Sequence, residues 1–97
     1  MNIEDSKPID FVEYIRKQRC VVCFESGVDP DHLKSIGMGR NRNKEDLLEH
    51  YSCIPLCRTH HMERHATSMA RFEQKHKVNL FKENHEYLMD FFKKLLN

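Results

Sequence analysis

Two short residue pairs with the same spacing constrain the fold of this chain more than any other feature. Cys20 and Cys23 are separated by two residues, and Cys57 and His60 repeat that spacing further along. A tight turn with this spacing directs two side chains toward one side of a tetrahedron, and two such turns complete the shell of a structural zinc ion. We therefore predict a zinc site at Cys20, Cys23, Cys57 and His60.

Two alternatives to this site follow from the same residues. His61 directly follows His60 and could supply the fourth ligand instead. A redox role for Cys20 and Cys23 is typical of a thioredoxin-like alternation of strands and helices, for which the chain is too short. Cys53 is left outside the site and is expected to be a small buried side chain.

The size of the chain makes a metal useful for folding. With 97 residues, no Trp and 39% hydrophobic residues, the chain has a small core. A domain of this size buries only about two-thirds of its unfolded surface, and a bound zinc ion adds folding free energy. Chelation should therefore unfold it.

Charge and hydropathy exclude several classes of protein. The 16 basic and 15 acidic residues nearly cancel, so net charge indicates no partner. No apolar run approaches the roughly 20 residues of a membrane span, and the N-terminus lacks the apolar stretch of a secretory signal. We expect a cytoplasmic protein without membrane contact, in which close Cys pairs bind metal more often than they form disulfides.

Hydrophobic periodicity predicts an α+β fold in one domain, residues 1–97, with a core at 20–66 and a helical extension at 67–97. The expected elements are helices over residues 8–17, 57–65, 68–76 and 80–96, and strands over residues 28–35 and 51–56. In the last helix, a stripe is formed by Phe81, Leu88, Phe92 and Leu95. It either packs on the rest of the domain or serves as a dimer or docking face.

A second group of residues predicts a separate ion site. His61 and His65 are four residues apart on an expected helix, so both project from one face. Asp31, or Asp29 two residues earlier, would add a carboxylate from the first strand, and His32 would then be available as a base. Two exposed His on a polar helix are the simpler alternative.

These residues suit phosphodiester hydrolysis. A divalent ion polarises the phosphate, and a neutral His can take a proton from water near pH 7. Positive charge for a nucleic-acid backbone is expected at Lys34, Arg40, Arg42, Lys44 and Arg58, with Arg64 and Arg71 adding to it. Two imidazoles and a carboxylate suit Mn²⁺, Ni²⁺ or Zn²⁺ better than Mg²⁺. Phosphate contacts alone do not distinguish DNA from RNA.

The chain resembles the HNH nucleases from Cys20 to about Phe81, most specifically in the run Ile-Pro-Leu-Cys-Arg-Thr-His-His at residues 54–61. It is most similar to small phage and prophage members that include the recombination-enhancement (Ref-type) nucleases. The resemblance implies a ββα-metal (treble-clef-like) finger with a structural zinc, flanked here by an N-terminal helix and C-terminal helices. It also implies a DNA endonuclease, phage-encoded or bacterial, with a recombinase filament or another phage DNA-processing protein as partner.

The resemblance assigns a role to each residue of the second group. His32 matches the general base, Asp31 matches the metal ligand before it, and His61 and His65 match the metal-binding His residues of the finger helix. Closer relatives often carry His where Asp31 stands.

The chain departs from the HNH pattern at the middle Asn. Ser52 stands where that Asn is expected, and His50, two residues earlier, is an alternative. Because adjacent strand residues point to opposite faces, Asp31 and His32 share one site only if the strand bends, which Pro30 would favour. A second functional prediction is therefore a zinc-stabilised DNA-binding or partner-binding module without catalytic activity.

Overall fold

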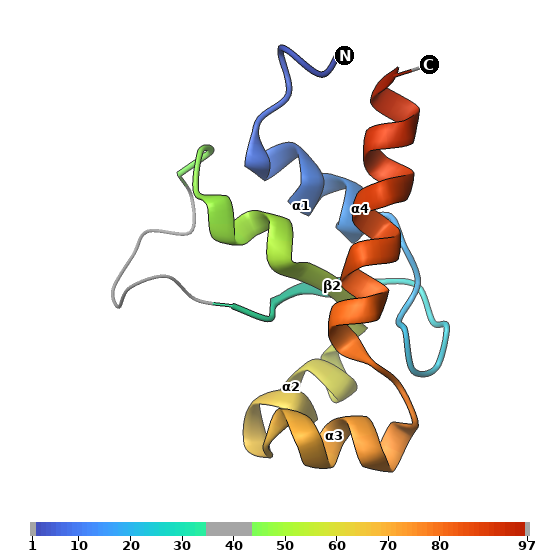
Figure 1. Ribbon diagram of the computed structural model, residues 1–97. Coiled ribbons are helices and arrows are strands. Elements are labelled where there is room, and N and C mark those ends of the chain that lie inside the picture. Colours follow the sequence, from blue (N-terminus) through green and yellow to red (C-terminus); the bar gives the residue numbers. More distant parts are fainter. Residues whose placement is uncertain (1, 35–43, 97) are drawn as a thin grey trace.

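The chain forms a small antiparallel sheet surrounded by helices in a computed structural model that describes residues 2–34 and 44–96 (Figure 1). In chain order, the elements are α1 (Pro8–Arg16), β1 (Val28–His32), the 3₁₀ helix η1 (Leu48–Ser52), β2 (Cys53–Cys57), α2 (Arg58–Ala66), α3 (Met69–His76) and α4 (Leu80–Leu96). This is the predicted α+β class, and β1, β2 and α2 form the ββα arrangement of the finger.

The two strands are shorter than the sequence pattern predicts. β1 ends at His32, before the expected end near residue 35, and residues 51 and 52 belong to η1 instead of β2. β1 pairs with β2 in a regular antiparallel register that runs from Val28 opposite Cys57 to His32 opposite Cys53. Beyond these five residues, the Leu33 N–H still donates to the Ser52 carbonyl over 3.1 Å, where η1 takes the place of the predicted start of the second strand.

β2 is buried along its whole length because hydrophobic clusters cover both of its faces. Ile54 and Leu56 pack with Phe72 from α3 and Leu80 from α4 in one cluster. Cys53 packs with α1 and the C-terminal half of α4 in the other, so the expectation that it is a small buried side chain is confirmed. The strand reads as a continuous apolar run, which is the pattern of a strand covered on both sides.

Helix α1 begins where the sequence predicts and anchors the second cluster. Pro8 occupies its first turn, and the Asp10 carboxylate accepts a hydrogen bond of 2.7 Å from the Lys7 backbone N–H. Phe11 and Phe91 meet edge to face with ring centroids 5.4 Å apart, an arrangement favoured by the aromatic quadrupole. Packing of α4 on α1 is therefore the confirmed role of the buried face of α4.

The predicted stripe on α4 is wrong at its first member. Phe81 is 49% exposed, and the helix instead buries Leu80, Asn84 and Phe91, with Leu88 half-buried. Hydrophobicity alone misplaced the stripe because the buried face contains a polar residue, Asn84. At 17 residues α4 is the longest helix, and no helix in the described part of the chain is long and apolar enough to cross a membrane.

Helices α2 and α3 lie together at the opposite end of the molecule from the last turns of α4 (Figure 1). α2 follows β2 without a connecting loop, with Cys57 as its N-cap. Ser68 caps α3, since its hydroxyl accepts a 3.1 Å hydrogen bond from the Arg71 N–H. The direct passage from β2 to α2 positions every His of α2 relative to the sheet.

Candidate metal centres and active site

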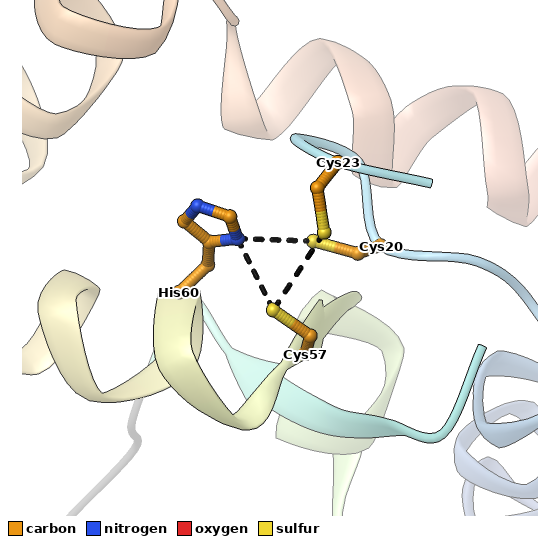
Figure 2. Close-up of side chains that lie close together, drawn as sticks. All are labelled: Cys20, Cys23, Cys57 and His60. Carbon is orange, nitrogen blue, oxygen red and sulfur yellow. Dashed lines mark hydrogen bonds between the residues drawn. The ribbon is translucent and has the colours of Figure 1, made fainter. Parts of the chain in front are cut away.

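Three thiols and one imidazole converge between the loop after α1 and the start of α2. Figure 2 shows Cys20, Cys23, Cys57 and His60 turned toward one another, and one ligand atom from each lies within 4.8 Å of the others. His60 Nδ1 is 3.1 Å from Cys57 Sγ and 3.6 Å from Cys20 Sγ, and the Cys23 and Cys57 sulfurs are 3.8 Å apart. The structure therefore groups His60, and not His61, with the three cysteines.

The separations of 3.6 and 3.8 Å match a tetrahedral zinc ion, and the Cys57–His60 separation of 3.1 Å is shorter than its ideal edge. Zinc bonds of about 2.3 Å to sulfur and 2.0–2.1 Å to nitrogen imply tetrahedral edges of about 3.8 Å between sulfurs and about 3.6 Å between sulfur and nitrogen. The turn that presents Cys20 and Cys23 is closed by two backbone hydrogen bonds, from Phe24 N–H to Cys20 O and from Cys20 N–H to Glu25 O. Phe24 has φ of 64°, a left-handed conformation that completes the tight turn.

The thiols of this group differ in acidity. Burial opposes ionisation of Cys20, but hydrogen bonds from the backbone of Cys57, Cys23 and Val22 outweigh it and lower the thiol pKa from 9.0 to about 7. For Cys23, a backbone hydrogen bond from Glu25 lowers the pKa, but desolvation and the neighbouring Cys20 and Cys57 sulfurs raise it to about 11. Thiols this close cannot all ionise without a cation, and a bound zinc ion would supply that charge.

A layer of polar side chains lies behind His60. Glu63 is one turn further along α2, and its carboxylate is 2.9 Å from His76 Nε2 and 2.7 Å from Lys75 Nζ on α3. The His60 and His76 rings meet edge to face with centroids 5.2 Å apart. Hydrogen bonds from Lys75 and His76 lower the pKa of Glu63. These contacts connect α3 to the helix that carries His60.

The second group, Asp31, His61 and His65, lies between β1 and α2. The carboxylate of Asp31 is fully buried, and its Oδ1 is 2.9 Å from His65 Nε2 and 3.6 Å from His61 Nδ1. One ligand atom of each lies within 4.8 Å of the others. His61 Nδ1 is buried and has no hydrogen-bond partner among the described residues. A buried nitrogen that makes no hydrogen bond, next to a buried carboxylate, is the arrangement expected for residues that bind a divalent ion through N and O.

The contacts of Asp29 and Asp31 show which carboxylate lies with His61 and His65. Asp29 Oδ2 accepts a hydrogen bond of 2.8 Å from Arg58 Nε at the start of α2, and its side chain lies outside the group of potential ligands. Arg64 donates to the other oxygen of Asp31, again over 2.8 Å. Arg64, which the sequence assigned to the positive charge for phosphate, instead contacts the buried carboxylate.

His32 and His50 form a hydrogen-bonded pair on the other side of β1. His50 Nε2 donates to the Lys44 carbonyl over 2.8 Å, because a carbonyl can only accept. A neutral His50 then accepts at Nδ1, which lies 3.0 Å from His32 Nε2. In this arrangement His32 donates at Nε2, so its neutral tautomer carries no proton on Nδ1. His50 itself is 1% exposed, so its orientation is fixed by its surroundings.

The pairing of β1 with β2 continues through Pro30 without interruption. Pro30 pairs with Pro55 in a regular register, and strand alternation sends Asp31 to α2 and His32 to η1. The two side chains therefore contact different elements, although they are consecutive. Ser52 stands where the HNH Asn is expected, and its hydroxyl donates to the Glu49 carbonyl over 2.7 Å.

Three of the five basic residues predicted to bind phosphate lie among the described residues. Lys34 and Lys44 are exposed and lie beside the His32–His50 pair, since the Lys34 N–H donates to Ser52 Oγ over 3.2 Å and the Lys44 carbonyl accepts from His50. Arg58 is exposed and pairs with Asp29. The remaining two predicted contacts, Arg40 and Arg42, lie outside the described residues.

Sequence reasoning did not place Glu63 in the first group or Arg64 in the second, where Arg64 was expected to contact phosphate instead, and it missed His76. A helical signal existed for the first two, because Glu63 is three residues after His60 and Arg64 three after His61, which places each on the face of that His. His76 comes from α3, and only the packing of α3 on α2 brings it near His60. No sequence spacing indicates that contact.

A two-stranded antiparallel sheet, a helix that carries paired His residues, and a Cys₃His group beside them together define a ββα-metal finger. The family model described as "Putative HNHc nuclease" matches residues 2–94. The chain therefore belongs to this HNH nuclease family. No curated protein and no solved structure matches the chain significantly.

Proposed function

We propose that this protein is a divalent-ion-dependent endonuclease that hydrolyses phosphodiester bonds in DNA. The observation that carries the proposal is the Asp31, His61 and His65 group, which β1 joins to the His32–His50 pair because Asp31 and His32 are consecutive. Membership of the HNH nuclease family supports the reaction class. Apart from His50, the residues of both groups are those that the resemblance to HNH nucleases assigned.

A bound divalent ion would polarise the scissile phosphate and stabilise the leaving oxygen. His32 acts as the general base, because its Nδ1 takes the proton from the attacking water. His50 holds His32 in that tautomer through its own bond to the Lys44 carbonyl. This pairing gives His50 the orienting task that the family's middle Asn performs, while Ser52 bonds to the backbone.

The proposed substrate contacts are exposed basic residues near the base and at the start of α2. Lys34 and Lys44 are exposed next to the His32–His50 pair, and Arg58 is exposed at the start of α2. Positive charge at these positions would bind backbone phosphates without reading sequence. Arg40 and Arg42 extend the proposed contact set by their position in the sequence alone.

The wider biological setting is part of the proposal. We infer from the resemblance to Ref-type nucleases that the protein is phage- or prophage-derived, works in the bacterial cytoplasm, and takes part in recombination or DNA processing. A recombinase filament is the partner this implies. We also propose that residues 1–97 act as one nuclease domain, in which 20–66 carry both metal sites and 67–97 complete the core.

Plasmid cleavage tests the proposed activity. The purified zinc-loaded chain is incubated with supercoiled plasmid and Mg²⁺, Mn²⁺, Ni²⁺ or additional Zn²⁺, beside a His32→Ala variant. We expect nicked and linear products, and a rate about 100- to 10,000-fold lower in the variant, which is the usual contribution of a general base. Equal cleavage by the variant would contradict the assignment of His32. A labelled RNA in parallel distinguishes the two nucleic acids.

The same experiment distinguishes the second candidate function, a DNA-binding module without catalytic activity, from the proposed nuclease. Plasmid binding in a gel-shift assay, with no cleavage under any ion, would favour a zinc-stabilised DNA-binding module. The observation that supports this alternative is Ser52 at the position of the family's Asn. Absence of both binding and cleavage would contradict a DNA substrate.

A further inference from the structure

Arg64 contacts the two consecutive residues that the proposed site needs most. Its Nε donates to Asp31 Oδ2 over 2.8 Å, and its Nη2 donates to the His32 carbonyl over 3.4 Å. Its side chain is only 13% exposed, and that of Asp31 is fully buried. A single guanidinium therefore connects the carboxylate of the ion site with the main chain of the proposed base.

The two oxygens of Asp31 have different surroundings. Oδ1 faces both imidazoles of the group, at 2.9 Å from His65 Nε2 and 3.6 Å from His61 Nδ1. Oδ2 faces Arg64. Asp31 is fully buried, so Oδ2 needs a partner within the protein. Among the described residues, Arg64 is the one that forms an ion pair with Oδ2. This leaves Oδ1 as the oxygen presented to an ion.

We propose that Arg64 is a positioning residue for the catalytic ion: it fixes Asp31 so that Oδ1 alone is offered as a ligand, and it holds the β1 main chain at His32. The inference rests on the proposed function, since it assumes an ion between Asp31, His61 and His65. Arg64 acts through Asp31 and is not itself a ligand. Residues that orient a ligand in this way usually contribute about 10- to 100-fold to metal affinity.

Charge alone predicts the opposite effect of Arg64 on metal affinity. A guanidinium next to a cation site repels the ion, so an Arg64 that merely neutralised the buried Asp31 would weaken metal binding. Removal of Arg64 would then tighten binding. The two roles therefore predict changes of opposite sign in metal affinity, which can be measured without any nucleic acid.

The test is a titration of zinc-loaded protein with Mn²⁺, followed by calorimetry and by the loss of the free Mn²⁺ EPR signal. Arg64→Met retains the length of the side chain and removes its hydrogen bonds and charge. We expect Mn²⁺ affinity about 10- to 100-fold below that of the unmodified protein. Unchanged or tighter binding in Arg64→Met would overturn the inference.

The chain contains a matched control for this substitution. Arg58 and Asp29 form the same β1-to-α2 pair with the same atoms at the same distance of 2.8 Å, but Arg58 is 77% exposed and Asp29 lies outside the group. Arg58→Met should leave Mn²⁺ affinity unchanged. A comparable loss in both variants would show a general effect of positive charge on α2 and would overturn the positioning role.

A second variant covers the case in which Arg64→Met fails to fold, judged by zinc content and thermal melting. Arg64→Lys keeps a cation for Asp31 but cannot provide the fixed planar pair of contacts to Asp31 and His32. We expect a loss of Mn²⁺ affinity in this variant as well, and unmodified affinity would overturn the inference. If the unmodified protein binds no Mn²⁺ beyond its zinc, the proposed ion site fails and this inference fails with it.

Discussion

His60 and His61 are neighbours on α2, yet their side chains belong to two different groups. His60 Nδ1 lies 3.1 Å from Cys57 Sγ, and His61 Nδ1 lies 3.6 Å from Asp31 Oδ1. Successive residues on a helix are rotated by about 100° around its axis, since one turn takes 3.6 residues. One turn of α2 can therefore supply a structural site on one side and a candidate catalytic site on the other.

Substitutions of His60 and His61 should have different effects, one on the fold and the other on the candidate catalytic ion. His60→Ala should lose the zinc ion and the fold, because structural zinc contributes about 10–16 kcal/mol in small zinc domains and the total stability of a domain is about 5–15 kcal/mol. His61→Ala should keep one zinc and a cooperative melt but lose a second, exchangeable ion. Metal analysis and circular dichroism measure both. Zinc loss in His61→Ala would contradict the ligand assignment.

Zinc affinity should fall as the pH is lowered. The Cys23 thiol has a pKa of about 11 and is protonated at neutral pH before zinc binds, so zinc must displace its proton. Each displaced proton makes affinity about tenfold weaker per pH unit of acidification. A competition titration with a chromophoric chelator at several pH values between 6.5 and 8.5 measures the slope. Affinity independent of pH would rule out thiolate ligation by Cys23.

Cys53 provides the control for that titration. It is buried on β2 in the cluster with Phe11 and Phe91, four residues from Cys57 and outside the ligand group. Cys53→Ala should therefore bind one zinc with the same pH slope, whereas Cys57→Ala should not retain zinc. Loss of zinc in Cys53→Ala would mean that the wrong three cysteines have been assigned.

Variants at His50 and Ser52 should show which residue takes over the task of the family's Asn. His50→Ala removes the partner of His32 Nε2, so we expect a lower kcat for plasmid cleavage with unchanged Mn²⁺ affinity. Ser52→Ala removes bonds to the backbone only, so we expect a stability loss of about 1 kcal/mol and little change in kcat. The reverse pattern would assign the task to Ser52.

Asn84 should be important for stability although it is polar. It is 8% exposed, and its Nδ2 donates to the carbonyls of Tyr51 and Cys53 over 2.8 and 3.0 Å, which connects α4 to the junction of η1 and β2. Asn84→Leu removes both hydrogen bonds and should lower the free energy of unfolding by about 1–3 kcal/mol. Urea denaturation measures this.

The neighbouring residue is the control for this experiment. His85 is exposed on α4, and His85→Ala should change the free energy of unfolding by less than about 0.5 kcal/mol. Equal losses in the two variants would indicate a general effect on helix α4 instead of the loss of the Asn84 hydrogen bonds.

Much of the fold was predictable because its signals are local. Pro8 at the start of α1 and Ser68 before α3 specify helix starts through their own backbone and side-chain chemistry, and both helices begin within one residue of their predicted starts. The buried face of α4 was misplaced because a hydrogen-bonded Asn84 lies in it, and hydropathy assigns Asn to the surface. The lengths of the strands were missed because pairing, not composition, ends them.

The sequence by itself determined the residue types and spacings of both groups. The Cys20 and Cys23 pair, the repeat at Cys57, and the His residues of α2 are sufficient to predict a zinc finger, since ligand spacing within a turn or helix is a local property.

Only the tertiary structure decided which atoms meet. Packing of β1 against α2 selects Asp31 over Asp29 and brings Arg64 to its second oxygen, and the 3₁₀ helix η1 places His50 against His32. These contacts join residues 18 to 33 positions apart. Their geometry depends on strand register and on the angle of a helix to a sheet, which no local spacing specifies.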